Sequence, residues 1–177
     1  MLLAVDTSTR YAGVALADES RVLACRIWYS TVNHTAELMP ALAQTLQSQG
    51  LTLAGLRGIA VALGPGGFSA LRVGMSVAKG LAVAAKKPLV GLGSLDLEAY
   101  PYLASGLPVC ALLDAGRGEV AAAHFGPSGQ RTREDLICPP EEVLESIQEP
   151  TLFCGEAVSG WGELIKYLAV SASGIST

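Results

Sequence analysis

Apolar and polar positions along the chain form two kinds of segment, short apolar runs and longer amphipathic stretches. Apolar runs with β-branched residues are typical of buried strands, and apolar residues three or four positions apart are typical of helices. The runs predict strands at residues 2–5, 11–17, 21–29, 58–63, 88–92, 109–114, 119–125 and 151–154. Helices are predicted at residues 35–49, 69–85 and 94–100 and after Ala157, with an acidic, Pro-punctuated loop and helix at 134–149. This order of elements indicates an α/β fold.

The opening pattern of the chain returns after a break at Gly106-Leu107-Pro108. In each half an apolar strand delivers an aspartate, Asp6 or Asp114, to a polar or Gly-containing turn, and a second apolar strand leads away. Such internal repetition is the mark of a duplicated architecture. We therefore expect two related lobes, residues 1–105 and 106–177, each a mixed β-sheet with flanking helices.

Residues 64–74, Gly-Pro-Gly-Gly-Phe-Ser-Ala-Leu-Arg-Val-Gly, connect a predicted strand to a predicted helix. Glycine supplies the backbone freedom that a sharp reversal needs, and Ser69 can cap the helix. One interpretation is a tight turn with close helix packing. The other is a nucleotide or phosphate site, because backbone N–H groups at a helix start attract anions. The stretch matches neither a P-loop nor a dinucleotide-binding pattern and offers no Lys for a phosphate, which favours the tight turn while the phosphate site stays an alternative. The contacts of such a site would be Asp6, Gly66, Gly67, Ser69 and Asp114.

The two longer predicted helices, 35–49 and 69–85, offer apolar stripes. Pro40 requires that the first helix either start near Met39, with Pro40 at its first position, or bend there. The second helix is rich in Ala and Gly, which permits close packing on its own sheet or against another helix. We expect the stripes of both helices to form a partner interface, in a four-helix bundle with the equivalent helices of a second chain. The expected interface residues are Leu38, Met39, Leu42, Leu46, Leu71, Met75 and Ala78.

Metal motifs are weak in this sequence. His34 and Glu37 could be imagined as ligands, but a helix cap with an acid favourable to the helix dipole is the more frequent arrangement. The four cysteines are widely scattered and form no C-x-x-C, which excludes a zinc knuckle and a redox motif. We expect no bound metal and no cofactor.

Composition limits the partners and the compartment. The net charge is −4 and no Lys or Arg cluster exceeds Lys86-Lys87, so the chain alone should bind nucleic acid poorly and reach RNA through a partner. The first residues lack the basic region and the long apolar core of a secretion signal, which favours the cytoplasm. Lysines and Pro88 interrupt the most apolar segment, residues 73–92, so no membrane span is predicted.

Four segments together resemble a known family, the bacterial TsaB (YeaZ) family, and residues 64–74 are close to its G-P-G-S-F-T-G-L-R-I-G motif. The resemblance implies the duplicated actin/Hsp70-like (ASKHA) fold and a role in making N6-threonylcarbamoyladenosine at position 37 of tRNAs that read ANN codons. It implies a non-catalytic subunit, a homodimer when alone, that binds and activates the catalytic paralogue TsaD together with the ATPase TsaE. The segments are residues 6–8, 33–40, 64–74 and 113–120.

Two comparisons with catalytic relatives support the non-catalytic role. TsaD holds its metal with an H-x-x-x-H motif on the helix after the strand equivalent to residues 88–92, where this chain has Ser94 and Glu98. The rival hypothesis is an ASKHA ATPase or nucleotide-binding enzyme, but Asp6-Thr7-Ser8 lacks the Gly that lets backbone approach phosphate, and Arg117 places a bulky cation in the second turn. The sequence contains no recognisable protease motif. We also expect the second lobe to be incomplete relative to the family.

Overall fold

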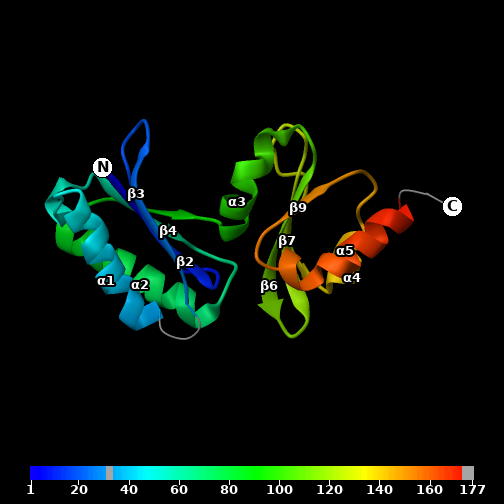
Figure 1. The fold of residues 1–177 in the computed structure, drawn as a ribbon, viewed down its shortest axis with the longest axis horizontal. Helices are drawn as coiled ribbons and strands as arrows, with labels where there is room; N and C mark the ends of the chain where they lie inside the picture. Colours follow the sequence, from blue (N-terminus) through cyan, green and yellow to red (C-terminus); the bar gives the residue numbers. More distant parts are fainter. Residues whose placement is uncertain (31–33, 173–177) are drawn as a thin grey trace. The chain divides into compact units, whose positions relative to one another are not determined.

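The structure, a computed structural model, describes residues 1–30 and 34–172, and it does not describe the side chains of residues 166–172. Asn33, which belongs to one of the family-like segments, and residues 173–177 of the expected second lobe lie outside the described residues. Internal contacts divide the chain into two compact units, Met1–Ser94 and Leu95–Thr177. Each unit contains one sheet with helices packed on it (Figure 1).

The first unit is a five-stranded sheet in the order β3-β2-β1-β4-β5. The first three strands are antiparallel neighbours, while β4 pairs parallel with β1 and with β5. Two helices lie on one face of this sheet and contact each other (Figure 1). The elements are β1 (Leu2–Asp6), β2 (Tyr11–Ala17), β3 (Val22–Tyr29), α1 (His34–Ser48), a 3-10 turn η1 (Leu53–Gly55), β4 (Gly58–Ala62), α2 (Phe68–Ala85) and β5 (Leu89–Leu92).

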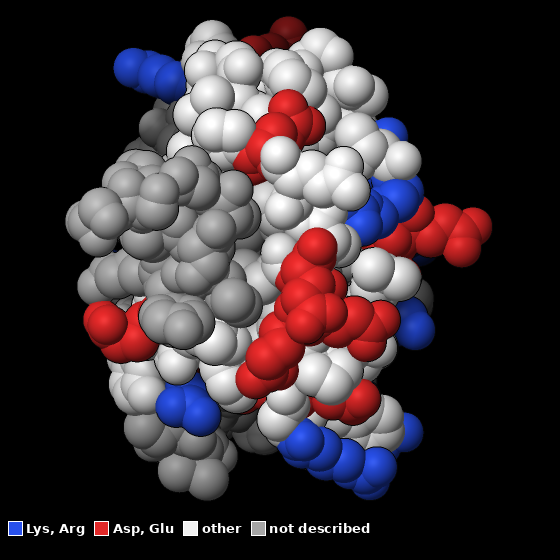
Figure 2. Space-filling model, turned by 90° about the vertical axis from the view of Figure 1, so that its right-hand side faces the viewer, with Lys and Arg blue, Asp and Glu red and all other residues white. Residues whose placement is uncertain are grey.

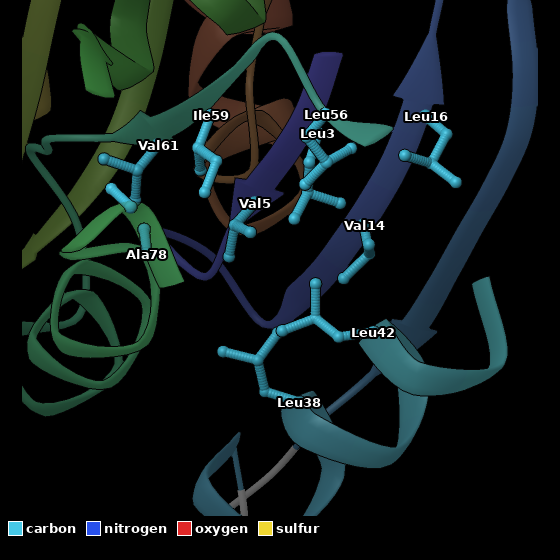
Figure 3. Packing of buried hydrophobic residues seen from close by; sticks show 11 residues of the cluster. Leu3, Val5, Val14, Leu16, Leu38, Leu42, Leu56, Ile59, Val61 and Ala78 are labelled. Carbon is cyan, nitrogen blue, oxygen red and sulfur yellow. The ribbon is translucent and has the colours of Figure 1, made fainter. Parts of the chain in front are cut away.

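The core of the first unit lies between the sheet and its two helices (Figure 3). Alternate residues of the central strands, such as Leu3 and Val5 of β1, point toward Leu38 and Leu42 of α1 and toward Ala78 of α2. Because side chains alternate across a strand, every second apolar residue reaches this layer. The amphipathic stripes of both helices are therefore used to build their own unit.

The second unit repeats the first in a four-stranded sheet, ordered β8-β7-β6-β9. Strands β6 and β7 form an antiparallel hairpin as β1 and β2 do, and β9 pairs parallel with β6 as β4 does with β1. This equivalence confirms the predicted duplication and the mixed sheets. The elements are α3 (Ser94–Ala99), η2 (Tyr100–Ser105), β6 (Val109–Gly116), β7 (Glu119–Phe125), β8 (Leu136–Cys138), α4 (Pro140–Glu145), β9 (Leu152–Cys154) and α5 (Val158–Ala172).

Three local predictions are corrected. Helix α1 begins at His34, so Pro40 lies inside it and not at its first position, and His34 does not precede the helix. Helix α2 begins at Phe68 after the N-cap residue Gly67, so Ser69 lies in the first turn and is not the cap. Strand β8 falls in the region expected to hold only a loop and a helix, because three residues beside prolines give little sequence signal.

Helix α2 also has the length and composition of a membrane-spanning helix. In the first unit, however, it buries Gly74, Ala78 and Ala82 against the sheet. Small residues at this spacing let the helix axis approach the strands closely. A Cβ at Gly74 would lie 2.3 Å from the hydroxyl oxygen of Thr7, so this position requires glycine.

Candidate functional site

The aspartate turn of the first unit is closed by its own side chains. The carboxylate of Asp6 accepts hydrogen bonds from the backbone N–H of Ser8 at 2.8 Å and from its hydroxyl at 2.7 Å. Thr7, which is buried, donates its hydroxyl to the carbonyl oxygen of Ala70 in α2 at 2.7 Å. An aspartate that accepts from the residue two positions on forms an Asx turn. Asp6 thus shapes the hairpin.

The glycine-rich turn packs directly on this hairpin. The backbone N–H of Gly67 donates to the carbonyl oxygen of Ser8 at 3.0 Å. A Cβ on Gly66 would lie 2.1 Å from the same oxygen, which leaves room for no side chain. The tight-turn interpretation is therefore the one that the geometry favours. The N–H of Gly67, one of the donors of the hypothetical phosphate site, is already engaged.

Ser94 secures the other end of the glycine-rich turn. Its hydroxyl accepts from the backbone N–H of Gly64 at 3.1 Å, and its own N–H donates to the carbonyl oxygen of Gly64 at 2.8 Å. Ser94 is buried at the first position of α3, and Glu98 lies one helical turn later. The side chain at this position thus has a structural partner.

The aspartate turn of the second unit has the same local chemistry. The carboxylate of Asp114 accepts from the backbone N–H of Gly116 at 2.7 Å. Arg117 follows with a φ of 58°, between Gly116 and Gly118, which also have positive φ. This turn is exposed. A phosphate can approach a backbone turn closely only where no bulky side chain stands in the way, and this turn carries the guanidinium of Arg117. Asp6 and Asp114 belong to different units, and each serves its own turn.

Most of the residues expected at the partner interface lie in or against the core of their own unit. Leu38, Leu42 and Ala78 are buried in the core of the first unit, since the stripes that they form face the sheet. Leu46 and Met75 are partly buried and pack against the same core, and Leu71 is also partly buried. Of the expected residues, Met39 is clearly exposed, with 49% of its surface accessible.

The outer face of α2 holds apolar residues that the sequence analysis missed. Phe68 is 69% exposed and Val83 is 79% exposed, and Arg72 lies over the Phe68 ring at 4.2 Å. Together with Lys79 and the C-cap Lys86, they recur at helical spacing along one side of the helix, here called the α2 outer stripe. The positions of Arg72 and Lys79 predict which side of α2 is exposed, because charged residues mark the solvent side of an amphipathic helix.

Histidine and acidic side chains are dispersed. The carboxylate of Glu37 accepts a hydrogen bond from the indole N–H of Trp28 at 3.0 Å. This bond holds α1 against β3, and it occupies the carboxylate that could otherwise join His34 as a metal ligand. Within the described part of the chain, no group of three or more His, Cys, Asp or Glu side chains could hold a metal ion. Cys110, Cys138 and Cys154 are buried free thiols and Cys25 is exposed.

Two comparisons decide the family. The family model described as TsaD, tRNA N6-adenosine threonylcarbamoyltransferase, matches residues 29–174. The tRNA threonylcarbamoyladenosine biosynthesis protein TsaB of Escherichia coli is 31% identical over 171 residues, which cover 90% of this chain and 71% of that protein. The chain belongs to the TsaB (YeaZ) family.

Solved structures agree with this membership in the TsaB (YeaZ) family. YeaZ from Pseudomonas aeruginosa has a TM-score of 0.78 and 29% sequence identity, over 92% of this chain and 78% of that one. The ethanolamine utilization protein EutJ from Carboxydothermus hydrogenoformans shares the fold alone, with a TM-score of 0.50 at 14% identity over 97% of this chain and 60% of that one. The resemblance to TsaB and the ASKHA fold are confirmed, and the family is one of threonylcarbamoyladenosine biosynthesis.

Proposed function

We propose that the chain is a non-catalytic subunit that binds and activates a TsaD-type catalytic paralogue, together with a TsaE-type ATPase. The complex would transfer threonylcarbamoyl to adenosine 37 of tRNAs that read ANN codons. In this proposal the chain works in the cytoplasm, contacts tRNA only through the complex, uses no membrane, and forms a homodimer when alone. Its membership in the TsaB (YeaZ) family supports the pathway.

The observation that carries the proposal is the α2 outer stripe. Phe68 and Val83 expose most of their surface on a helix whose opposite side is already packed. Exposed aromatic and arginine side chains that lie together are typical centres of protein interfaces. Met39 adds an exposed apolar residue on the neighbouring helix α1. We assign the partner interface, and the competing homodimer interface, to the outer faces of these two helices.

The distribution of charged residues along the chain indicates which kind of partner surface would fit α1 and α2. Residues 1–94 contain eight Lys or Arg and four Asp or Glu, whereas residues 95–177 contain four and twelve. Within α1 and α2 the one acidic residue, Glu37, is bound to Trp28. A partner surface with carboxylates would therefore complement Arg72 and Lys79.

The second unit is acidic, and Figure 2 shows a band of Asp and Glu side chains on the face drawn there. This negative charge disfavours direct binding of tRNA to that face.

The occupied turns support a non-enzymatic role. Asp6 and the N–H of Gly67 are both engaged in hairpin packing, so two of the contacts expected for a nucleotide already have partners within the fold. Ser94, in the place of the first histidine of the transferase motif, binds Gly64. Neither a serine hydroxyl nor a lone glutamate replaces two imidazoles as ligands for a transition metal.

A reconstituted assay tests this function. Purified chain, a TsaD-type protein and a TsaE-type protein are mixed with tRNA, ATP and the threonylcarbamoyl donor, and each protein is omitted in turn. We expect modification only when this chain and the TsaD-type protein are both present. Modification by this chain alone, or ATP hydrolysis by it at the roughly 1 to 10³ per second of typical enzymes, would contradict the proposal.

A further inference from the structure

Strand β3 forms a free edge of the first sheet. In the order β3-β2-β1-β4-β5 it pairs with β2 on one side. No strand in the part of the chain that the structure describes pairs with its other side. An unpaired edge of apolar residues is a template for a further strand, and proteins usually block such an edge with proline, a bulge or a charge.

The pairing with β2 identifies the backbone groups on the outer side of β3. The N–H of Ser30 donates to the carbonyl oxygen of Arg10 at 2.8 Å, and the register stays regular from there back to Ala24. Because hydrogen-bonded and non-hydrogen-bonded pairs alternate along an antiparallel ladder, Ser30 and every second residue before it turn N–H and C=O toward β2. The residues between them turn both groups outward, and these are Cys25, Ile27 and Tyr29.

The outer half of β3, residues 25–29, is also apolar and exposed. Ile27 is 68% exposed, and Cys25 is an exposed free thiol. The exposed ring of Tyr29 packs edge-on against the ring of Tyr11 in β2, with 5.3 Å between the centroids. This segment contains no proline, and the irregularity in the β2–β3 register lies before it. Its edge is therefore regular and open to another strand.

Arg26 is the one charged residue of this segment, and it restricts which strand can pair there. Its side chain lies on the same side of the sheet as that of Trp28, because side chains alternate along a strand. The indole N–H of Trp28 donates to the carboxylate of Glu37 at 3.0 Å. A strand that places an arginine opposite Trp28 would meet both an aromatic ring and a carboxylate. Strand β3 is itself such a strand.

We propose that two copies of the chain pair antiparallel through the outer edges of β3, with Ile27 on the two-fold axis. A strand that pairs antiparallel with its own copy makes every contact twice, as a two-fold interface requires. Cys25 then lies opposite the second copy's Tyr29, and the outward N–H and C=O groups of both residues exchange hydrogen bonds. Arg26 lies opposite the second copy's Trp28, where Cα atoms of a non-hydrogen-bonded pair are about 4.5 Å apart.

The neighbouring registers fit less well. A register centred on Arg26 would oppose two guanidinium groups, which is unfavourable between directly facing residues. One centred on Cys25 would include the irregular part of β3, and one centred on Trp28 would shorten the ladder. Centring on Ile27 keeps the two arginines apart and brings each within reach of the carboxylate of the second copy's Glu37.

The β3 edge is separate from the α2 outer stripe. Helix α2 contacts β1, β4 and β5, whereas α1 contacts β2 and β3. The β3 edge and α2 thus lie toward opposite ends of the first sheet. A chain with a TsaD-type partner on its α2 outer stripe keeps the β3 edge open, and two such complexes would join through it. The pairing itself does not depend on the proposed function.

Amide hydrogen exchange, followed by NMR at low and high protein concentration, tests the pairing. The full chain carries Val83→Glu, so that self-association through the α2 outer stripe contributes little. We expect the outward amides of Cys25, Ile27 and Tyr29 to exchange at least about tenfold more slowly at high concentration. The amide of Trp28, which already faces β2, should change less. Light scattering should show the mass of the dimer under the same conditions.

Two lysine variants locate the contact. Ile27→Lys should abolish the concentration dependence, because two ammonium groups would meet on the axis. The residue is exposed, so the chain should still fold. The matched control is Val90→Lys, since Val90 is 54% exposed on β5 at the other edge of the same sheet. This control should keep the concentration dependence in full.

Four results would overturn the proposal. Exchange of the three outward amides that does not change with concentration would show that β3 does not pair with a second copy. Full protection at the lowest concentration would show that the chain covers this edge itself. Concentration dependence that survives Ile27→Lys would place the contact elsewhere. Protection that appears only when a TsaD-type protein is added would show that another protein occupies the edge.

Discussion

The backbone N–H of Gly67 donates to the carbonyl oxygen of Ser8 at 3.0 Å. This bond joins the glycine-rich turn to the first aspartate turn, and it engages a donor that could otherwise face a phosphate. Gly66 lies so close to the same carbonyl oxygen that no side chain fits there. In the same aspartate turn, the hydroxyl of Thr7 donates to the carbonyl oxygen of Ala70 in α2. The strongest motif of the sequence therefore has a packing role that fixes where α2 starts and which side of α2 faces outward.

Gly66→Ala should be strongly destabilising. The new Cβ would lie 2.1 Å from the carbonyl oxygen of Ser8, which belongs to the backbone and cannot move aside cheaply. We expect a loss of about 3 kcal/mol in the free energy of unfolding, measured by urea denaturation. The control is Gly80→Ala in α2, where a Cβ meets nothing within 4 Å; this change should stabilise by roughly 0.5–1 kcal/mol. Equal stability of the two variants would refute the close packing.

Asp6→Asn should be mild. The amide oxygen of asparagine can still accept from the N–H and hydroxyl of Ser8, so the change should cost less than about 0.5 kcal/mol, whereas Asp6→Ala should cost about 1–2 kcal/mol. Thermal unfolding gives the stabilities, and the reconstituted assay gives the activity. Intact stability with lost tRNA modification in Asp6→Asn would favour a nucleotide role for this carboxylate.

His124 should make the protein less stable in mild acid. Burial and the nearby positive charge of Arg133 lower its pKa from 6.5 in the unfolded chain to about 4 in the folded protein, so between these values the unfolded state binds the extra proton. Stability is unaffected by this group above pH 6.5 and declines as the pH falls toward 4. We expect a contribution of about 2 kcal/mol, seen as the difference in pH dependence between the parent and His124→Phe. The same slope in both proteins would contradict the lowered pKa.

Local periodicity was enough to predict most strands, the two long helices and the duplication. It could not tell which neighbour an apolar stripe faces, because Leu38 and Leu42 suit a partner helix and an internal sheet equally well. The structure makes the distinction on the other side of α2, where Phe68, which lies under Arg72, and Val83 stay exposed. His124 and Arg133 were not predicted as a pair, since only the fold brings the end of β7 beside the loop that precedes β8.

The location of the interface decides which variant tests it. Met75 is partly buried against the core, so Met75→Glu would disturb the fold as well as the interface. Val83 is 79% exposed on the α2 outer stripe, and a glutamate there stays in water in the isolated chain. Val22 is a matched control, because this valine of β3 is 63% exposed and lies outside the two helices.

Light scattering of mixtures with a TsaD-type protein measures whether the outer face of α2 binds the partner, and tRNA modification gives a second readout. Val83→Glu should keep the folded state but weaken complex formation at least about tenfold, because it replaces an exposed apolar contact by a carboxylate that would repel the carboxylates expected on the partner surface. It should weaken the homodimer in parallel and lower modification. Val22→Glu should bind and function as the parent does. If Val83→Glu forms the complex and supports full modification, the partner does not bind the outer face of α2 and the account is wrong.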